Sequence, residues 1–358
     1  MLKITEMLRY IIYFLSSSFI SASLIPLIIK LSNKYGFVDI PNNRKIHKKP
    51  ISRLGGLAIF ISFLIVFSII LIKYYNQLNI TFNIKIYIIA LFLAFILGFL
   101  DDIKNIRARY KLIVQIIISF LVSLSGLSIA RFTFFNFFAI NFGLFSHFIT
   151  IVWIVLIMNS INLIDGMDGL ASGIVAIATI FLLIVSILMK NILVSLISSV
   201  LLGSIIGFYI YNFPPAKIFM GDSGAYFLGF MYATLGLMGI KKTTIAVLFL
   251  VPLVLLFIPI IDVFAVSFKR LKDRKNIFTP DKNHLHHRLL ALGFSNKKVL
   301  IILYLSTIIL GFFSLLIVFI PNKFSFTLFI LLFLVVFFLF YLIHQFEKLI
   351  KNTINNKN

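Results

Sequence analysis

The chain has 358 residues, of which 61% are hydrophobic and only 12% are charged. A soluble domain carries about a quarter charged residues, so this composition excludes an ordinary soluble protein. The net charge of +22 does not indicate nucleic-acid binding, because the basic residues flank apolar stretches and do not form one basic domain. The absence of cysteine excludes disulfides and thiolate metal sites.

The apolar residues form long unbroken stretches. A helix needs about 20 apolar residues to cross the ~30 Å hydrocarbon core, where no water satisfies an open backbone. The predicted fold is therefore all-α, a polytopic bundle of about 11 transmembrane helices. The expected spans are 7–30, 54–72, 86–100, 112–130, 145–158, 169–189, 191–209, 224–239, 243–266, 298–320 and 325–345. We expect one domain, with chemical motifs in 31–297, two further spans in 298–345 and a polar tail at 346–358.

Eleven spans would place the connecting loops alternately on two sides of the membrane. One side then holds 24 of the 33 Lys and Arg residues, and the positive-inside rule makes that side cytoplasmic. The N-terminus would lie outside and the C-terminus inside. Ser21-Ala22-Ser23 resembles a signal-peptide cleavage site, but cleavage would place loop 31–53 outside, against the charge distribution. All carboxylates except Glu6 fall on the cytoplasmic side, which the rule does not require, so they indicate a site there.

Asp101 and Asp102 form the first candidate site, where an apolar span meets the basic loop 104–111. Adjacent carboxylates repel unless a cation neutralises them. The pair is therefore suited to a diphosphate and Mg²⁺, which prefers oxygen ligands. Solvated charges at a helix end are the alternative interpretation.

Two polar segments open later spans. Asn162, Asp165 and Asp168 are three residues apart, and this spacing would place them on one helical face or one tight re-entrant turn. Helix capping by Asp168 is the alternative, but it explains one residue and not the row. Asp222 and Ser223 follow a second polar segment that begins at Asn212. This segment could bind an anion, hold a cation or simply cap a helix.

The loop at 267–297 combines basic residues with a histidine cluster. His284, His287 and Arg288 would share one face of a short helix, which suits diphosphate binding or acid–base chemistry near neutral pH. A zinc site is a competing interpretation, although the basic neighbours would repel a metal. An amphipathic helix on anionic lipid is the structural alternative. In the first loop, Gly55-Gly56 beside Arg53 would let the backbone approach a phosphate closely, or the loop is only a basic anchor.

These motifs together resemble the polyprenyl-phosphate N-acetylhexosamine-1-phosphate transferases. The matching residues, in family order, are Asp39-x-Pro41 with Arg44, His47, Pro50 and Arg53-x-Gly-Gly; Gly98-Phe-Leu-Asp101-Asp102; Asn162-x-x-Asp165-Gly-x-Asp168-Gly; Phe219-Met-Gly-Asp222-Ser-Gly; and His284-x-His286-His287-Arg288. The resemblance covers about residues 30 to 295. Within the family, the arginine of the first motif and the histidine motif are more similar to the branch that initiates teichoic acid linkage units, enterobacterial common antigen or O-antigen. The phospho-N-acetylmuramoyl-pentapeptide transferase branch is less similar.

The resemblance implies an all-helical bundle with a cytoplasm-facing catalytic cleft, and it implies a role for each motif. Asp222 would bind Mg²⁺, or Mn²⁺ in its place, with Asp101 and Asp102 beside the metal and the lipid phosphate. The remaining implied site residues are Asn162 and Asp165 at the nucleotide; Asp168 and Asn212 in the polar floor; His284, His286, His287 and Arg270 at the sugar diphosphate, with Arg288 and Arg53; and a basic residue of the first loop, Lys48 or else Lys45 or Lys49.

The implied activity is transfer of N-acetylhexosamine-1-phosphate, with GlcNAc as the expected sugar, from a UDP-sugar to undecaprenyl phosphate with release of UMP. The expected partners are these two substrates and membrane lipids, with no nucleic acid, and a homodimer is left open. The expected location is the bacterial inner membrane with the active site facing the cytoplasm. A transporter for an anionic solute is the main rival, but transporters place ionisable residues near the midplane and are often built from internal repeats, which this sequence lacks. A non-catalytic scaffold would not need these polar rows.

Overall fold

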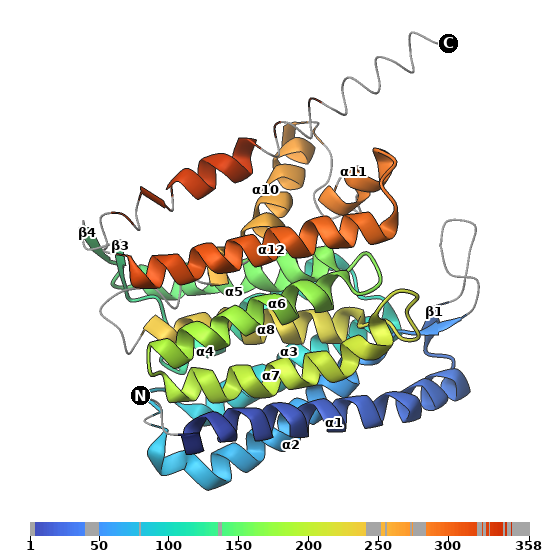
Figure 1. Ribbon diagram of the computed structural model, residues 1–358, viewed down its shortest axis with the longest axis horizontal. Coiled ribbons are helices and arrows are strands. Elements are labelled where there is room, and N and C mark those ends of the chain that lie inside the picture. Colours follow the sequence, from blue (N-terminus) through green and yellow to red (C-terminus); the bar gives the residue numbers. More distant parts are fainter. Residues whose placement is uncertain are drawn as a thin grey trace.

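The computed structural model of the chain is a bundle of long helices that lie side by side (Figure 1). It describes residues 4–39, 50–78, 80–134, 138–240, 252–254, 256–272, 274, 284–320, 324, 327–328, 330–338, 341 and 345. The helices are α1 (Ile4–Tyr35), α2 (Gly55–Tyr74) with the 3₁₀ turn η1 (Tyr75–Gln77), α3 (Ile84–Lys104), α4 (Ala108–Leu124), α5 (Phe145–Ile164), α6 (Leu170–Leu188), α7 (Ile192–Asn212), α8 (Gly221–Ile240), α10 (Phe257–Lys272), α11 (Leu285–Ala291) and α12 (Asn296–Phe319).

Two short antiparallel hairpins lie at opposite ends of the bundle (Figure 1). Strands β1 (Val38–Asp39) and β2 (Ile51–Ser52) pair at the end where α1 finishes. Strands β3 (Arg131–Phe134) and β4 (Phe138–Asn141) pair at the end that holds the N-terminus. The two hairpins therefore mark the two ends of the helical bundle.

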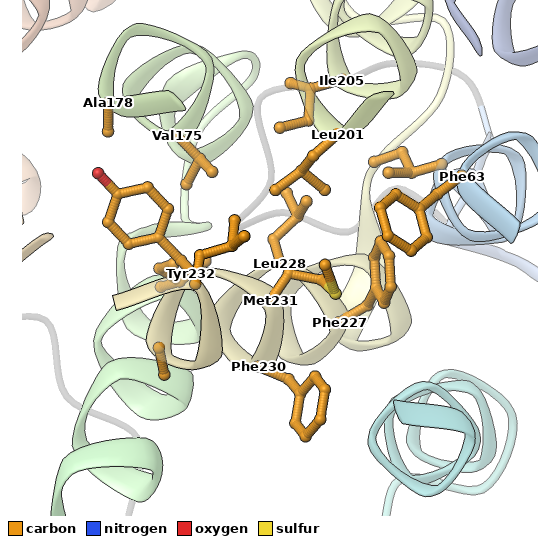
Figure 2. Packing of buried hydrophobic residues seen from close by; sticks show 14 of the residues in the cluster. Phe63, Val175, Ala178, Leu201, Ile205, Phe227, Leu228, Phe230, Met231 and Tyr232 are labelled. Atoms are coloured by element: carbon orange, nitrogen blue, oxygen red, sulfur yellow. The ribbon is translucent and has the colours of Figure 1, made fainter. Parts of the chain in front are cut away.

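Helix α8 forms the centre of the bundle and is buried on every side. An apolar sequence around the whole circumference predicts such a position, because no face favours water. Phe227 faces Phe63 of α2, while Tyr232 faces Val175 and Ala178 of α6 (Figure 2). Helices α2, α3, α5 and α6 pack around it, so the first turn of α8 is held from several directions.

Small residues let helices approach closely around this core. Gly56 of α2 lies so close to Gly224 of α8 that a Cβ at position 56 would collide with the Gly224 backbone. Helices α1 and α7 meet in the same way, where Ser17 donates to the Val200 carbonyl at 2.9 Å and Ser21 to the Ser204 carbonyl at 2.8 Å. Small and hydroxyl side chains commonly mediate helix association in membranes, where close packing replaces the hydrophobic drive.

The predicted all-α membrane class is confirmed, since seven described helices are long and apolar enough to cross a membrane. They correspond to the predicted spans that begin at residues 7, 54, 86, 145, 169, 191 and 298. The two short predictions, 86–100 and 145–158, lie within longer helices, Ile84–Lys104 and Phe145–Ile164. Among the described residues α8 also covers the span 224–239, whereas 243–266 and 325–345 lie partly outside them, so the count of eleven stays a prediction.

The predicted span 112–130 is longer than the helix that forms. Helix α4 ends at Leu124, because Ser125 is followed by Gly126, whose φ of 97° lies outside the helical region. The chain then reaches the β3–β4 hairpin, which the apolar composition of 131–141 does not distinguish from a span. This hairpin lies at the end of the bundle opposite β1 (Figure 1).

Candidate active site

A cavity of about 520 Å³ is lined in part by Asp39 of β1 and Ile51 of β2. Figure 1 shows that β1 lies at one end of the bundle. The cavity lies where α1, α3, α5 and α7 end and where α2, α8 and α12 begin, so one end of the bundle supplies it. Its polar side chains are those of Asp39, Arg53, Asp101, Asp102, Asn105, Asp165, Asp168, Asn212, Asp222, His287 and Asn296. Residues from every sequence motif therefore meet at one place, although they lie up to about 250 positions apart in the chain.

Asp101, at the end of α3, is buried and accepts two hydrogen bonds. Its Oδ1 accepts from the Ile106 backbone N–H at 2.6 Å, and its Oδ2 accepts from the Lys111 ammonium at 2.6 Å. The same ammonium lies 3.4 Å from Oδ2 of Asp222 and 5.9 Å from the centre of the Tyr226 ring. Lys111 thus bridges two carboxylates and compensates part of their mutual repulsion.

Asp102 has a different role from its neighbour, because its carboxylate caps helix α8. Oδ1 accepts from the Asp222 backbone N–H at 2.7 Å and Oδ2 from the Ser223 backbone N–H at 3.0 Å. The first N–H groups of a helix have no partner within it, and a carboxylate there also interacts favourably with the helix dipole. Asp102 therefore holds α3 to the start of α8 and fixes the position of Asp222 in the first turn of that helix.

Asp222 and Asn162 form a direct contact between two sequence motifs. The Asn162 side-chain N–H donates to Oδ1 of Asp222 at 2.7 Å, from the last turn of α5. One helical turn earlier, Asn159 donates to the Gln115 amide oxygen on α4 at 2.7 Å. These amides fix the end of α5 against α4 and α8, and they leave lone pairs of Asp222 directed at the cavity.

Asp168 and Asn212 hold the two loops that border the cavity. Asp168 accepts from the Ala216 backbone N–H at 3.0 Å. The buried Asn212 accepts from the Gly169 N–H at 3.1 Å and from the Ser172 hydroxyl at 2.7 Å, and it donates to the Ile218 carbonyl at 2.9 Å. Both side chains line the cavity, and both join the α5–α6 loop to the α7–α8 loop.

Asp165 differs from the other carboxylates of the cavity, because within the described residues its carboxylate accepts no hydrogen bond. Burial raises the pKa of Asp165 well above its usual range, and the neighbouring carboxylates of Asp222, Asp102 and Asp168 raise it further. A half-buried acid surrounded by acids is stabilised by any cation that reaches it. A cation that enters the cavity would therefore stabilise the charged form of Asp165, which receives no hydrogen bond from the described residues.

The histidine motif lies on α11 at the edge of the cavity. His287 lines the cavity and its ring centre lies 4.2 Å from that of His286. His286 is buried against Gly166, and its Nε2 has no hydrogen-bond partner among the described residues. Burial lowers the pKa of His286 to about 3, and repulsion from the rings of His287 and His284 adds to this effect. His284 is buried behind this pair and contacts Asp262 of α10.

The structure brings some predicted basic residues to the site and not others. Arg53 lines the cavity and is ion-paired with Asp39 across the β1–β2 hairpin. Arg270 on α10 and Arg288 on α11 are half-buried and do not line the cavity. Lys48, like Lys45 and Lys49, lies outside the described residues.

The oxygen donors of the cavity fit Mg²⁺, although they do not enclose it. Among the described residues no three acidic or histidine side chains converge as a complete metal cage. Mg²⁺ does not need one, because it keeps several waters and is usually bound through one or two carboxylates and substrate phosphates. Asp222 and Asp165 line the cavity and could supply such oxygens, Asp222 through the lone pairs that Asn162 and Lys111 leave unused. Asp101 and Asp102, also predicted at the metal, already accept protein donors and would have to bind it through their remaining lone pairs.

Sequence reasoning gave no role to two residues at this site. Lys111 was visible only as one member of a basic loop, since its bridge to Asp101 and Asp222 depends on the packing of α4 against α3 and α5. Asp262 was visible as a carboxylate inside the predicted span 243–266. An ionisable residue within a span is by default a functional candidate, and that signal could have identified it.

Comparisons with known proteins agree with the geometry. The model of Glycosyl transferase family 4 matches residues 84–240. The chain is 33% identical over 307 residues to the Bacillus subtilis (strain 168) protein named "Probable undecaprenyl-phosphate N-acetylglucosaminyl 1-phosphate transferase", covering 84% of this chain and 82% of that one. It is 25% identical over 288 residues to the undecaprenyl-phosphate alpha-N-acetylglucosaminyl 1-phosphate transferase of Salmonella typhi, covering 79% and 77%. It is 37% identical over 129 residues to the decaprenyl-phosphate N-acetylglucosaminephosphotransferase of Mycobacterium leprae, covering 33% and 32%.

Proposed function

The chain belongs to the polyprenyl-phosphate N-acetylhexosamine-1-phosphate transferase family, and we propose that it transfers GlcNAc-1-phosphate from UDP-GlcNAc to undecaprenyl phosphate. The observation that carries the proposal is the convergence of the sequence motifs on one cavity at one end of the bundle. A transferase whose acceptor is a membrane lipid needs such a site, open to a soluble donor and close to the lipid headgroup. By the distribution of Lys and Arg, this end faces the cytoplasm of a bacterial inner membrane.

The reaction is a phosphoryl transfer that needs little covalent help from the protein. An oxygen of the lipid phosphate forms a bond to the β-phosphorus of the donor, and the bond from that phosphorus to the bridging oxygen breaks. UMP leaves with the bridging oxygen, and the lipid keeps the diphospho-sugar. Positioning and charge compensation dominate catalysis of such steps.

The side chains of the cavity divide these tasks. Asn162 and Lys111 orient Asp222 at the start of α8, and Asp102 holds that start in place. His287 and Arg53, which both line the cavity, contribute polar contacts for the donor. A lipid phosphate is already largely ionised at neutral pH, because its second pKa is near ~6, so Asp101 need not act as a base.

Mg²⁺, held by Asp222 and Asp165, would compensate the charge that develops on the leaving phosphate. The other residues of the cavity act without the metal. Asp101 and Asp102 hold the end of α3 to the loop that follows it and to the start of α8. Asp168 and Asn212 hold the α7–α8 loop, which forms the floor of the cavity. Mn²⁺ offers the same preference for oxygen ligands and is expected to substitute.

The test is release of UMP from UDP-GlcNAc by the purified full-length protein with undecaprenyl phosphate and Mg²⁺. We expect release that Asp222→Ala abolishes and that Gln77→Ala leaves unchanged, because Gln77 lies in η1 after the end of α2 and does not line the cavity. Folded protein that releases no UMP from any UDP-hexosamine would overturn the proposal and favour transport of an anionic solute.

A further inference from the structure

The buried carboxylate of Asp262 lies behind the proposed active site and not in its cavity. It belongs to α10 and is only 2% exposed. Its Oδ1 accepts from the Leu285 backbone N–H at 2.9 Å, and its Oδ2 lies 3.0 Å from Nδ1 of His284. One side chain thus makes two contacts with the start of α11, the helix that carries the histidine motif.

Helix α11 depends on such contacts because it is short. It has seven residues, and isolated helices of that length are marginal because nucleation is costly. The residue at its N-cap position, His284, makes no side-chain hydrogen bond that caps the helix. The Asp262 carboxylate fills that role from a neighbouring helix, and it also interacts favourably with the positive end of the helix dipole.

The second contact determines the state of the His284 ring. A carboxylate oxygen can only accept, so the 3.0 Å contact requires a proton on Nδ1 of His284. A carboxylate partner of this kind fixes the tautomer and orientation of an imidazole. Asp262 therefore controls both the position of α11 and the orientation of its first histidine.

The position of α11 matters for the cavity, since His287 lines it and His286 fills the space against Gly166. We propose that Asp262 is a positioning residue that holds α11 so that its histidines face the donor diphosphate. The catalytic part of this inference rests on the transferase activity proposed above. The structural part, that Asp262 holds α11, stands without it.

The structural part can be tested by thiol labelling, because the chain contains no cysteine. Leu289 of α11 is 5% exposed, so Leu289→Cys places a single buried thiol on the helix. Asp262→Ala removes the cap of α11 and the contact with His284, so α11 should open more often. We expect maleimide to label the Leu289→Cys thiol about 10-fold faster or more when Asp262→Ala is also present. Leu285→Cys, at a 6% exposed position, is the second probe if the first variant does not fold. An unchanged rate at the probe would overturn the inference.

The catalytic part is tested by UMP release from Asp262→Asn in the full-length protein. Asparagine keeps an acceptor for the Leu285 N–H but cannot accept from Nδ1 if its amide N–H₂ faces His284. We expect labelling close to the parent and a kcat at least about 10-fold lower, with little change in KM for UDP-GlcNAc. Thr307→Val is the matched control, because Thr307 lines a pocket with Asp262 and His286 but, among the described residues, its hydroxyl hydrogen-bonds only to the Leu303 carbonyl of α12.

The outcomes separate the two proposals. If Asp262→Asn has the same kcat as the control Thr307→Val, the positioning role of Asp262 in the reaction is overturned. A parent protein that releases no UMP would overturn the proposed function, while the labelling rates would still decide whether Asp262 holds α11.

Discussion

The geometry separates Asp101 from Asp102, and this difference can be measured. Both oxygens of Asp102 accept backbone N–H groups at the start of α8, which is buried in the centre of the bundle. In Asp102→Ala both donors lose their partner. An N-cap is worth about 0.5–2 kcal/mol, and a hydrogen bond to a charged group about 1.5–3 kcal/mol, so the variant should lose about 2–4 kcal/mol of stability. Asp102→Asn keeps one acceptor and should lose about half of that.

The assay is the thermal midpoint in detergent together with the Mg²⁺ dependence of UMP release. We expect the Asp102 variants to unfold at lower temperature and to be less active, because Asp222 moves with the start of α8. Any rise in the Mg²⁺ concentration for half-maximal activity should accompany the loss of stability, because it would arise from the displacement of Asp222. The matched control is Asn83→Ala, which removes an exposed cap from α3 at the other end of the bundle. It should cost about 1 kcal/mol and leave activity unchanged.

An Asp102→Asn protein with the parent's thermal midpoint and a markedly higher Mg²⁺ requirement would refute this reasoning. That result would mean that Asp102 is a metal ligand and that its contacts with α8 are incidental.

Three further results are expected. Gly56→Ala should lower the thermal midpoint by several degrees or prevent folding, because its Cβ meets the Gly224 backbone of α8; an unchanged midpoint would contradict that packing. Burial lowers the pKa of His286 to about 3, so its ring stays neutral in the folded protein but gains a proton in the unfolded chain below about pH 6.5. The free energy of unfolding should therefore fall by up to about 1.4 kcal/mol per pH unit as the pH drops from about 6.5 toward 3. His286→Asn should remove that dependence on pH. Lys111→Met removes the positive charge beside Asp101 and Asp222. Added Mg²⁺ should therefore raise the thermal midpoint more in this variant than in the parent. Equal shifts would exclude a metal near Lys111.

The sequence predicted the helices and the clustering of motifs because both depend on simple periodic features. Apolar stretches of about 20 residues determine a span, and alternating spans place every second loop at the same end. That argument correctly assigned the ends of α3, α5 and α7 to one end of the bundle, where Asp101, Asp165 and Asn212 line one cavity. It failed for the end of α4, where a glycine after Ser125 stops the helix and a hairpin follows.

The roles of individual side chains were less predictable, because they depend on contacts between distant parts of the chain. Capping of α8 by its own Asp222 or Ser223 was one interpretation of the sequence, yet the cap comes from Asp102, 120 positions earlier. Asp262 and His284 are 22 positions apart and belong to different helices. A pattern of residue types shows which chemistry is available, whereas the packing decides which carboxylate remains free to use it.

Charge compensation gives the strongest physical argument about this site. Six carboxylates line the cavity, and among its described lining residues Arg53 is the one side chain with a permanent positive charge. Asp39 is already paired with it, and Lys111 reaches only Asp101 and Asp222. A diphosphate and a lipid phosphate would both be repelled by such a cavity unless a cation enters with them. Binding of UDP-GlcNAc should therefore depend on Mg²⁺ even without the lipid acceptor, and calorimetry that detects equal affinity with Mg²⁺ and with EDTA would contradict this electrostatic account.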